Sequence, residues 1–458
     1  MRSFVEIFVR FEHKYGDRDH CAAARTSEFA SQDGLLAKLV KLLASIWPAS
    51  GTYPHDAQLD NRPCKLHGSR LMQGEVLMDE IVCANTAFRY WRCPPQVRDL
   101  YPRLPSTEDG WRALSQAPFV TEVLKTPIIT AASTRSNLHS ELRRTIRWNE
   151  AYAGITSIDT EMGFSVTNPL NTLFTMTRFV PQIDLVLAMY EFCGWFSIFK
   201  PSAASESALE LANLDKAKSD TKELFEPDET QDDAYWKRVY PLAQQKDNEK
   251  SSQEKDGGGQ NKGKETSLWM RKPLIEIEEL QKFASEVKSE MWGRQFYDAA
   301  QQVIGVAASP LEVAGIMLLN RPRRQGGAGF NNIYVNDLTP LSVSARQIAG
   351  QKVCYGDIVL VNPITMKAVI IEIHGEVIHG SGAVLDHDAT RMTALQSMGY
   401  DVLLVTHDML NDHNQLDTII RSVCDHLELN YKPKTEAMRC AETRLRANAL
   451  SNWLDIGL

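Results

Sequence analysis

The clearest pattern of apolar and polar positions lies in the last third of the chain. Two apolar runs, Ile358–Val361 and Val369–Ile373, flank a polar turn, and a third run (DVLLVT) follows a segment that ends at Gly399. Short apolar runs bounded by turn residues are typical of strands, and glycine commonly ends a helix. The pattern therefore predicts a hairpin, a helix and a third strand between Tyr355 and Thr406.

Helical patterns surround this unit. The segments Phe296–Ile304 and Pro310–Leu319 precede it, and the amphipathic segment Leu416–Leu427 follows it, ahead of a helical tail. Helices that alternate with short strands are typical of α/β proteins. We expect an α/β fold with a mixed sheet in the C-terminal part of the chain.

The N-terminal half also contains α/β patterns. Ile81–Pro95 is predicted as a strand or strand and turn, Pro118–Thr134 as a helix leading into a strand, and Ser140–Trp148 as a basic helix or strand. A helix is expected to begin at Asn168-Pro169. The segment Gln182–Phe196 is apolar nearly all round, which predicts a buried helix.

A polar stretch separates the two halves. Asp247–Thr266 (DNEKSSQEKDGGGQNKGKET) has almost no apolar residues, so it cannot offset the entropy of ordering by burial. The predicted division is an unassigned N-terminal helical segment (1–80, with a helix candidate at Leu35–Trp47), an α/β accessory domain (81–200), a polar linker (201–266), a C-terminal domain (267–435) and a helical tail (436–458).

Composition narrows the class of protein. A chain of 458 residues has room for several domains at roughly 100–200 residues each, and 43% apolar residues can build sizeable cores. No apolar run approaches the roughly 20 residues of a membrane span, and Glu6 and Arg10 interrupt the apolar N-terminus, so we expect no membrane insertion and no secretory signal. The eight cysteines form no CxxC pair, which argues against a zinc knuckle or a disulfide framework and suits the cytoplasm. A net charge of −8 does not favour nucleic-acid binding, although a local basic groove matters more than the total.

Candidate chemistry gathers around the predicted hairpin. Asp357 begins its first strand, Glu372 and His374 end its second, and His379 follows. Because side chains alternate along a strand, Glu372 and His374 should share one face. Asp357 should share it too if it lies opposite Glu372, but sequence fixes that register only to about one residue. Carboxylates at strand ends are the ligands that hard divalent cations prefer.

The order of these residues resembles the PD-(D/E)xK nuclease-like superfamily, and within it a bacterial domain of unknown function related to the Vsr endonucleases. The resemblance covers the C-terminal ~130 residues. The matching positions are Asp357, Glu372-Ile373-His374-Gly375, His379, Asp388-Ala389-Thr390-Arg391, Leu395, Gly399 and Val402–Thr406. This chain departs from the superfamily where His374 replaces the usual lysine and Gly356 replaces the proline before the first acid. The resemblance implies a restriction-endonuclease-like core.

The same resemblance implies an activity and a site. The expected activity is metal-dependent hydrolysis of nucleic acid, with DNA as the expected substrate and bacterial defence as a setting. Asp357, Glu372, His374 and His379 would be catalytic, and Asp357, Glu372 and Glu312 would bind Mg²⁺ or Mn²⁺. His374 would orient water, and as a metal ligand it would favour Mn²⁺.

Basic residues supply candidate nucleic-acid contacts. Arg321, Arg323 and Arg324 precede a glycine-rich segment, and Arg391 belongs to the resemblance. Arginines of this kind can grip backbone phosphates. In the accessory region, VTNPLNTLFTMTR is similar to a segment of AbiEi-like antitoxin and abortive-infection proteins, which implies an α/β accessory domain over residues ~80–200, ahead of a nuclease-like domain. A protein partner or a second copy of the chain is a further candidate partner.

Each of these residues also has a purely structural interpretation. Glu312 stands three positions after Ser309, the spacing of a capping box, and Glu372 could form a buried pair with Arg391. The other structural readings are a turn end at Asp357, satisfied core histidines at His374 and His379, a local ion pair of Asp388 with Arg391, and a solvated loop at Arg321–Arg324. Two other functions therefore stay open: a non-catalytic nucleic-acid-binding or antitoxin-like regulatory protein with a degenerate nuclease fold, and a structural interaction protein.

Overall fold

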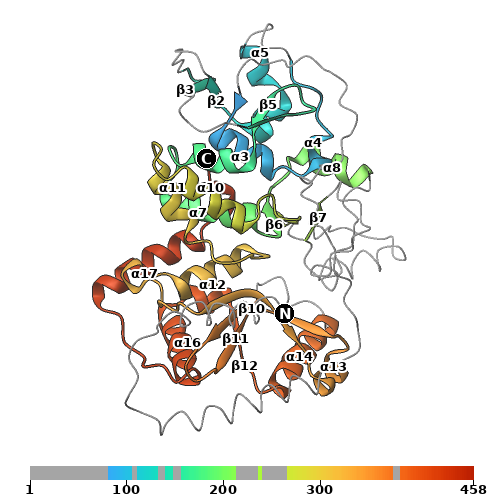
Figure 1. Ribbon diagram of the computed structural model, residues 1–458. Helices are drawn as coiled ribbons and strands as arrows, with labels where there is room; N and C mark the ends of the chain where they lie inside the picture. Colours follow the sequence, from blue (N-terminus) through green and yellow to red (C-terminus); the bar gives the residue numbers. More distant parts are fainter. Residues whose placement is uncertain are drawn as a thin grey trace, which may run out of the picture. The chain divides into compact units, whose positions relative to one another are not determined.

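The computed structural model describes residues 81–105, 111–132, 140–147, 156–212, 236–239, 266–374 and 382–457, all within one compact unit, Gly74–Leu458 (Figure 1). Helices combine with mixed sheets, so the predicted α/β class is confirmed. The helix candidate Leu35–Trp47 and the predicted catalytic residue His379 lie outside the described residues. None of the described helices is long and apolar enough to cross a membrane.

A four-stranded mixed sheet forms the C-terminal half. Its order is β12-β11-β10-β9, for β9 (Ile333–Pro340), β10 (Val353–Val361), β11 (Ala368–His374) and β12 (Asp401–Thr406). Strand β10 is antiparallel to its neighbours β9 and β11, and β12 runs parallel to β11. The parallel step requires a crossover, which α14 (Gly382–Ser397) provides, as the sequence predicted.

Helices cover both faces of this sheet. On one face α12 (Pro310–Asn320), α15 (His407–Asn411) and α16 (His413–His426) share a core with Ile358 and Ile371. On the other, α13 (Val343–Ala349) and α14 pack on Val359 and Ile370. Burial on both faces explains why β10 and β11 read as continuous apolar runs.

The N-terminal half holds a five-stranded sheet, ordered β3-β2-β1-β5-β4. Its strands are β1 (Ile81–Val82), β2 (Ile128–Ala132), β3 (Arg143–Arg147), β4 (Ser157–Asp159) and β5 (Ser165–Thr167). The strand predicted over Ile81–Pro95 is wrong beyond β1, because α3 (Ala84–Arg92) follows at once and buries Ala84, Ala87 and Phe88 at helical spacing.

The helices predicted near this sheet are present. Asn168 caps α6 (Pro169–Met176), its side chain accepting a hydrogen bond from the Asn171 amide at 2.8 Å. The buried helix is α7 (Gln182–Cys193). Further helices are α4 (Pro95–Arg98), α5 (Trp111–Gln116), the π-helix η3 (Val120–Leu124), α8 (Ala203–Ala212), α10 (Ile277–Glu286) and α11 (Gly293–Ala300).

Segments far apart in the sequence join the two halves. A small sheet, β6-β8-β7, combines β6 (Phe196–Ile198) and β8 (Leu268–Met270) with β7 (Lys237–Arg238), which lies in the predicted linker. The tail forms α17 (Glu436–Ala449), which packs on α12 and on η5 (Arg323–Gln325), followed by η7 (Trp453–Asp455). The largest hydrophobic core therefore contains side chains from both halves and from the tail.

Candidate functional site

The three predicted metal ligands lie close enough for their charges to interact. Asp357 comes from β10, Glu372 from β11 and Glu312 from the first turn of α12. Burial, together with the negative charges of Glu372 and Glu312, raises the pKa of Asp357 well above its ordinary value. The three carboxyl groups therefore form one electrostatic cluster, here called the Asp357 cluster.

The position of Asp357 is fixed by strand pairing. The β10–β11 ladder ends at the pair Ile358–Ile371, so Asp357 and Glu372 are the residues just beyond that pair on their two strands. The prediction that Asp357 begins its strand is wrong, because pairing with β9 extends β10 back to Val353. The Asp357 Oδ2 atom accepts the Ile373 amide at 2.7 Å. The carboxylate thus bonds a backbone donor at the point where the ladder ends.

The side-chain alternation of β10 slips at this point. The β9–β10 pairing skips the step between Asn336 and Asp357, and Asn336 has a φ of 47°. A Cβ atom on Gly356 would lie 3.0 Å from the side chain of Val359, so both positions face the same side of the sheet. Strict alternation would put positions 356 and 359 on opposite faces. Strict alternation therefore does not hold along β10 around Asp357.

Glu312 caps the start of α12 and also belongs to the Asp357 cluster. Ser309 caps α12 by accepting the Glu312 amide at 3.2 Å, and Glu312 Oε1 accepts the Ser309 hydroxyl at 2.9 Å. Its Oε2 atom accepts the Ala308 amide at 2.8 Å and the Asn336 side-chain amide at 3.1 Å. Burial raises the pKa of Glu312, although these hydrogen bonds and the charge of Arg391 oppose the rise.

Arg391 supplies the positive charge of the cluster. Its guanidinium, from α14, forms an ion pair with Glu372, which is only 1% exposed. The same charge lowers the pKa of Asp357 and Glu312, against the effect of burial. The buried pair that the sequence offered as a structural alternative is therefore present. The side chain of Asp388 is not among the described ones, so its predicted local pair with Arg391 stays a prediction.

His374 ends β11 next to these groups. It pairs with Thr406 of β12 and is half-buried. It lies two positions after Glu372 on the same strand, as the predicted common face requires.

The predicted arginine contacts lie elsewhere. Arg321 follows the last residue of α12, nine positions from Glu312, which corresponds to roughly 14 Å along a helix. Arg321 donates to the Gln302 side chain, and Arg323 donates to the carbonyls of Lys432 and Pro433 at 2.8 Å each. Arg324 is exposed. The structure does not bring these arginines to the Asp357 cluster.

Sequence reasoning missed Asn336. Its side chain donates to Glu312 and to the Val306 carbonyl at 2.8 Å, and so ties β9 to the start of α12. The only signal available was the residue type, since asparagine tolerates positive φ better than most residues.

The cluster suits a divalent cation in its donor chemistry. A bound Mg²⁺ or Mn²⁺ would stabilise these three carboxylates, of which Asp357 has its pKa raised by burial and by the other two. Each group already has a partner, however, and no set of three histidine, cysteine, aspartate or glutamate side chains in the described ranges is arranged to hold a metal ion. Metal binding therefore requires Glu372 to leave Arg391.

Comparison with known proteins adds no relative. No protein-family model, no curated protein and no solved structure matches the chain. The functional argument consequently depends on the chain's own residues.

Proposed function

We propose that this protein is a metal-dependent nucleic-acid hydrolase of the PD-(D/E)xK nuclease-like type, with DNA as its substrate. The observation that carries the proposal is the Asp357 cluster, in which burial and the neighbouring carboxylates raise the pKa of Asp357. Gathering buried like charges opposes folding, and such clusters are concentrated at functional sites.

The order of elements supports the proposal. A helix (α12), a hairpin (β10 and β11), a second helix (α14) and a further strand (β12) occur in the arrangement expected of such a nuclease core. Asp357 lies in the middle of β10, Glu372 near the end of β11 and Glu312 in the first turn of α12.

Each residue then has a role. Asp357 and Glu372, with Glu312, would hold Mg²⁺ or Mn²⁺, which would supply charge stabilisation of the phosphate and activation of water. His374 would orient the attacking water, and His379 would assist the leaving group. Arg391, which pairs with Glu372 in this structure, would contact a backbone phosphate.

The test is cleavage of plasmid and single-stranded DNA by the purified full-length protein with Mg²⁺ or Mn²⁺. Asp357→Asn and Glu372→Gln keep the side-chain shapes and should each reduce cleavage by about 100-fold or more, since a metal ligand contributes several kcal/mol to transition-state stabilisation. Asp408→Asn is the matched control, because that carboxylate is 83% exposed, and it should leave the rate unchanged. Cleavage that survives both cluster variants would refute the assignment.

A second candidate is a nucleic-acid-binding protein without catalytic activity. The ion pair of Glu372 with Arg391 favours this second function, because the Glu372 carboxylate would have to bind the metal in a catalytic site but is already neutralised by Arg391. Binding of DNA that weakens steeply with salt, shows no turnover and does not respond to metal would select this function.

A further inference from the structure

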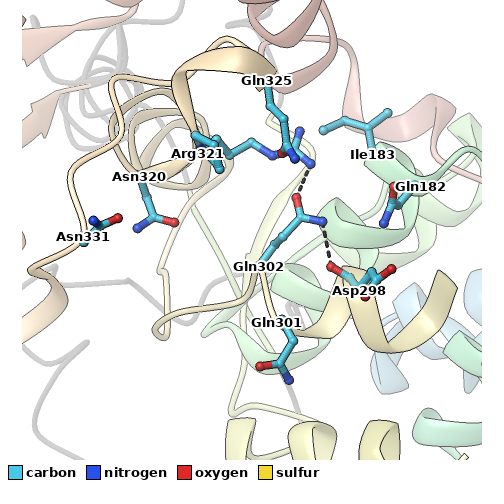
Figure 2. A pocket seen from close by; sticks show the side chains of 10 residues that line it. Gln182, Ile183, Asp298, Gln301, Gln302, Asn320, Arg321, Gln325 and Asn331 are labelled. Atoms are coloured by element: carbon cyan, nitrogen blue, oxygen red, sulfur yellow. Dashed lines mark hydrogen bonds between the residues drawn. The ribbon is translucent and has the colours of Figure 1, made fainter. Parts of the chain in front are cut away.

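A polar pocket lies at the opposite end of α12 from the Asp357 cluster (Figure 2). The start of α7, the end of α11 and the segment after α12 form its walls, and its volume is about 770 Å³. Small-molecule sites typically occupy about 300–1,000 Å³. Gln182 and Gln325 on its rim are exposed, so the pocket opens to the surface.

Arg321 brings an uncompensated positive charge to this pocket. One of its terminal nitrogens donates to Gln302 Oε1, but its Nε atom is buried and has no hydrogen-bond partner. No carboxylate of the described residues forms an ion pair with it, and burial lowers the pKa of its guanidinium. A partly buried cation without a counter-ion is costly, so an anion in the pocket would be stabilised.

Neighbouring groups hold the guanidinium in place. The Gln302 Nε2 atom donates to the Asp298 carbonyl at 2.8 Å, which fixes the amide that in turn accepts from Arg321 (Figure 2). A binding group whose rotamer is already fixed loses less entropy when a ligand arrives.

The rest of the lining offers hydrogen bonds of both kinds. Gln301, Gln325 and Asn331 each present a carboxamide, which donates and accepts, and Figure 2 shows them around Arg321. Carboxamides match the paired donors and acceptors on nucleobase edges. The one carboxylate in the wall, Asp298, pairs with Arg294 at 3.0 Å, which offsets its repulsion of an anion.

We propose that this pocket binds a nucleotide, with the phosphate on Arg321 and the base on the surrounding carboxamides. The proposal is independent of the hydrolase function, because the pocket shares no residue with the Asp357 cluster. A free mononucleotide and the 5′-terminal nucleotide of a strand carry the same chemistry.

The experiment measures binding to the full-length protein by calorimetry. The probes are the four nucleoside 5′-monophosphates, the matching nucleosides, inorganic phosphate, and an oligonucleotide with or without a 5′-phosphate. Arg321→Gln should weaken binding of the preferred monophosphate at least tenfold, since hydrogen bonds to a charged group are among the stronger ones. Arg321→Lys should retain part of the affinity, and Arg421→Gln, an exposed arginine of α16 outside the pocket, should change it less than twofold. Unchanged melting of the three variants shows that they fold.

The outcomes separate the alternatives. Tight binding of a free monophosphate that depends on Arg321 supports a mononucleotide site, and Arg321-dependent binding confined to the 5′-phosphorylated strand supports a strand-end site. Inorganic phosphate binding as tightly as every monophosphate overturns the base-binding part. Absence of nucleotide binding, or affinity unaffected by Arg321→Gln, overturns the proposal.

Discussion

Two buried carboxylate centres in this protein have opposite electrostatics. Glu442 of α17 is 1% exposed and accepts hydrogen bonds from Lys434, from Arg446 at 2.6 Å and from His413 at 2.7 Å. Burial alone would raise the pKa of Glu442, but the hydrogen bonds from Lys434 and His413 lower it below its ordinary value. In the Asp357 cluster, burial and neighbouring carboxylates raise the pKa of Asp357 instead.

The difference lies in the number of cations per acid. Three basic side chains surround Glu442, whereas in the cluster the positive charge of Arg391 acts on both Asp357 and Glu312. Ionised Glu442 therefore stabilises the fold, and ionised Asp357 destabilises it. The Asp357 cluster therefore lowers the stability of the fold, and natural proteins usually keep such a destabilising arrangement at functional sites.

The largest expected effect comes from removing Glu442. Glu442→Ala leaves Lys434 and Arg446 buried without their counter-charge, so we expect a loss of about 3–5 kcal/mol in the free energy of unfolding. Urea denaturation measures it. Glu436→Ala on the same helix is the control, since Glu436 is 84% exposed and its loss should cost under about 0.5 kcal/mol. Similar losses for both variants would abolish the contrast between the two centres.

A gain in stability is expected at Asp357. Asp357→Asn keeps an oxygen that can accept the Ile373 amide and removes a repelled charge, so at pH 7 it should stabilise the protein by about 1 kcal/mol. Thermal melting of the variant beside wild type checks this. A variant that melts below wild type at pH 7 would show that Asp357 is not repelled.

The dependence of these two effects on pH distinguishes the centres. The pKa of Asp357 is raised in the folded state, so the wild type loses stability as pH rises from about 4, the unfolded value, through the folded pKa. The gain from Asp357→Asn should therefore be absent near pH 3.5 and full above the folded pKa.

The pKa of Glu442 is lowered, so its contribution is full above about pH 4.3 and is lost as pH falls through the folded pKa. Denaturation of wild type and both variants across pH 3.5–8, in roughly half-unit steps, tests both signs.

The smallest expected effect is stabilisation by metal. Mn²⁺ at about five times its dissociation constant should raise the free energy of unfolding of wild type by about 1 kcal/mol, because binding to the folded state alone adds to stability. Asp357→Asn should abolish the shift, and Glu442 should have no part in it. An equal shift in wild type and Asp357→Asn would place the ion outside the cluster.

Local patterns account for what the sequence could predict. β12 coincides with the predicted DVLLVT run, and α6 and α12 begin at the Asn168 and Ser309 caps, because these signals lie within a few residues of the element they define. The strand β9 was missed because its interior is half-buried and carries Asn336 and Asp337, so it lacks an apolar run.

The site was predictable only in part, for the same reason. The acids and the neighbouring strands that carry them followed from the apolar patterns, but the register of Asp357 with Glu372 did not. The slipped alternation at Asn336 and the choice of Glu372 as the partner of Arg391 depend on contacts between distant segments, which no local pattern encodes.

The burial of Arg92 links the first half of the protein to the order of its synthesis. Arg92 binds Glu191 at 2.6 Å, and the same guanidinium donates to the Trp453 carbonyl, 361 positions later, at 2.7 Å. A ribosome releases Arg92 and Glu191 long before Trp453 exists. Until Trp453 of η7 has been translated, the guanidinium has Glu191 as its partner but lacks the Trp453 carbonyl. Translation from the N-terminus usually lets early domains fold first, whereas the hydrogen bonds of Arg92 are completed only after η7 has been made.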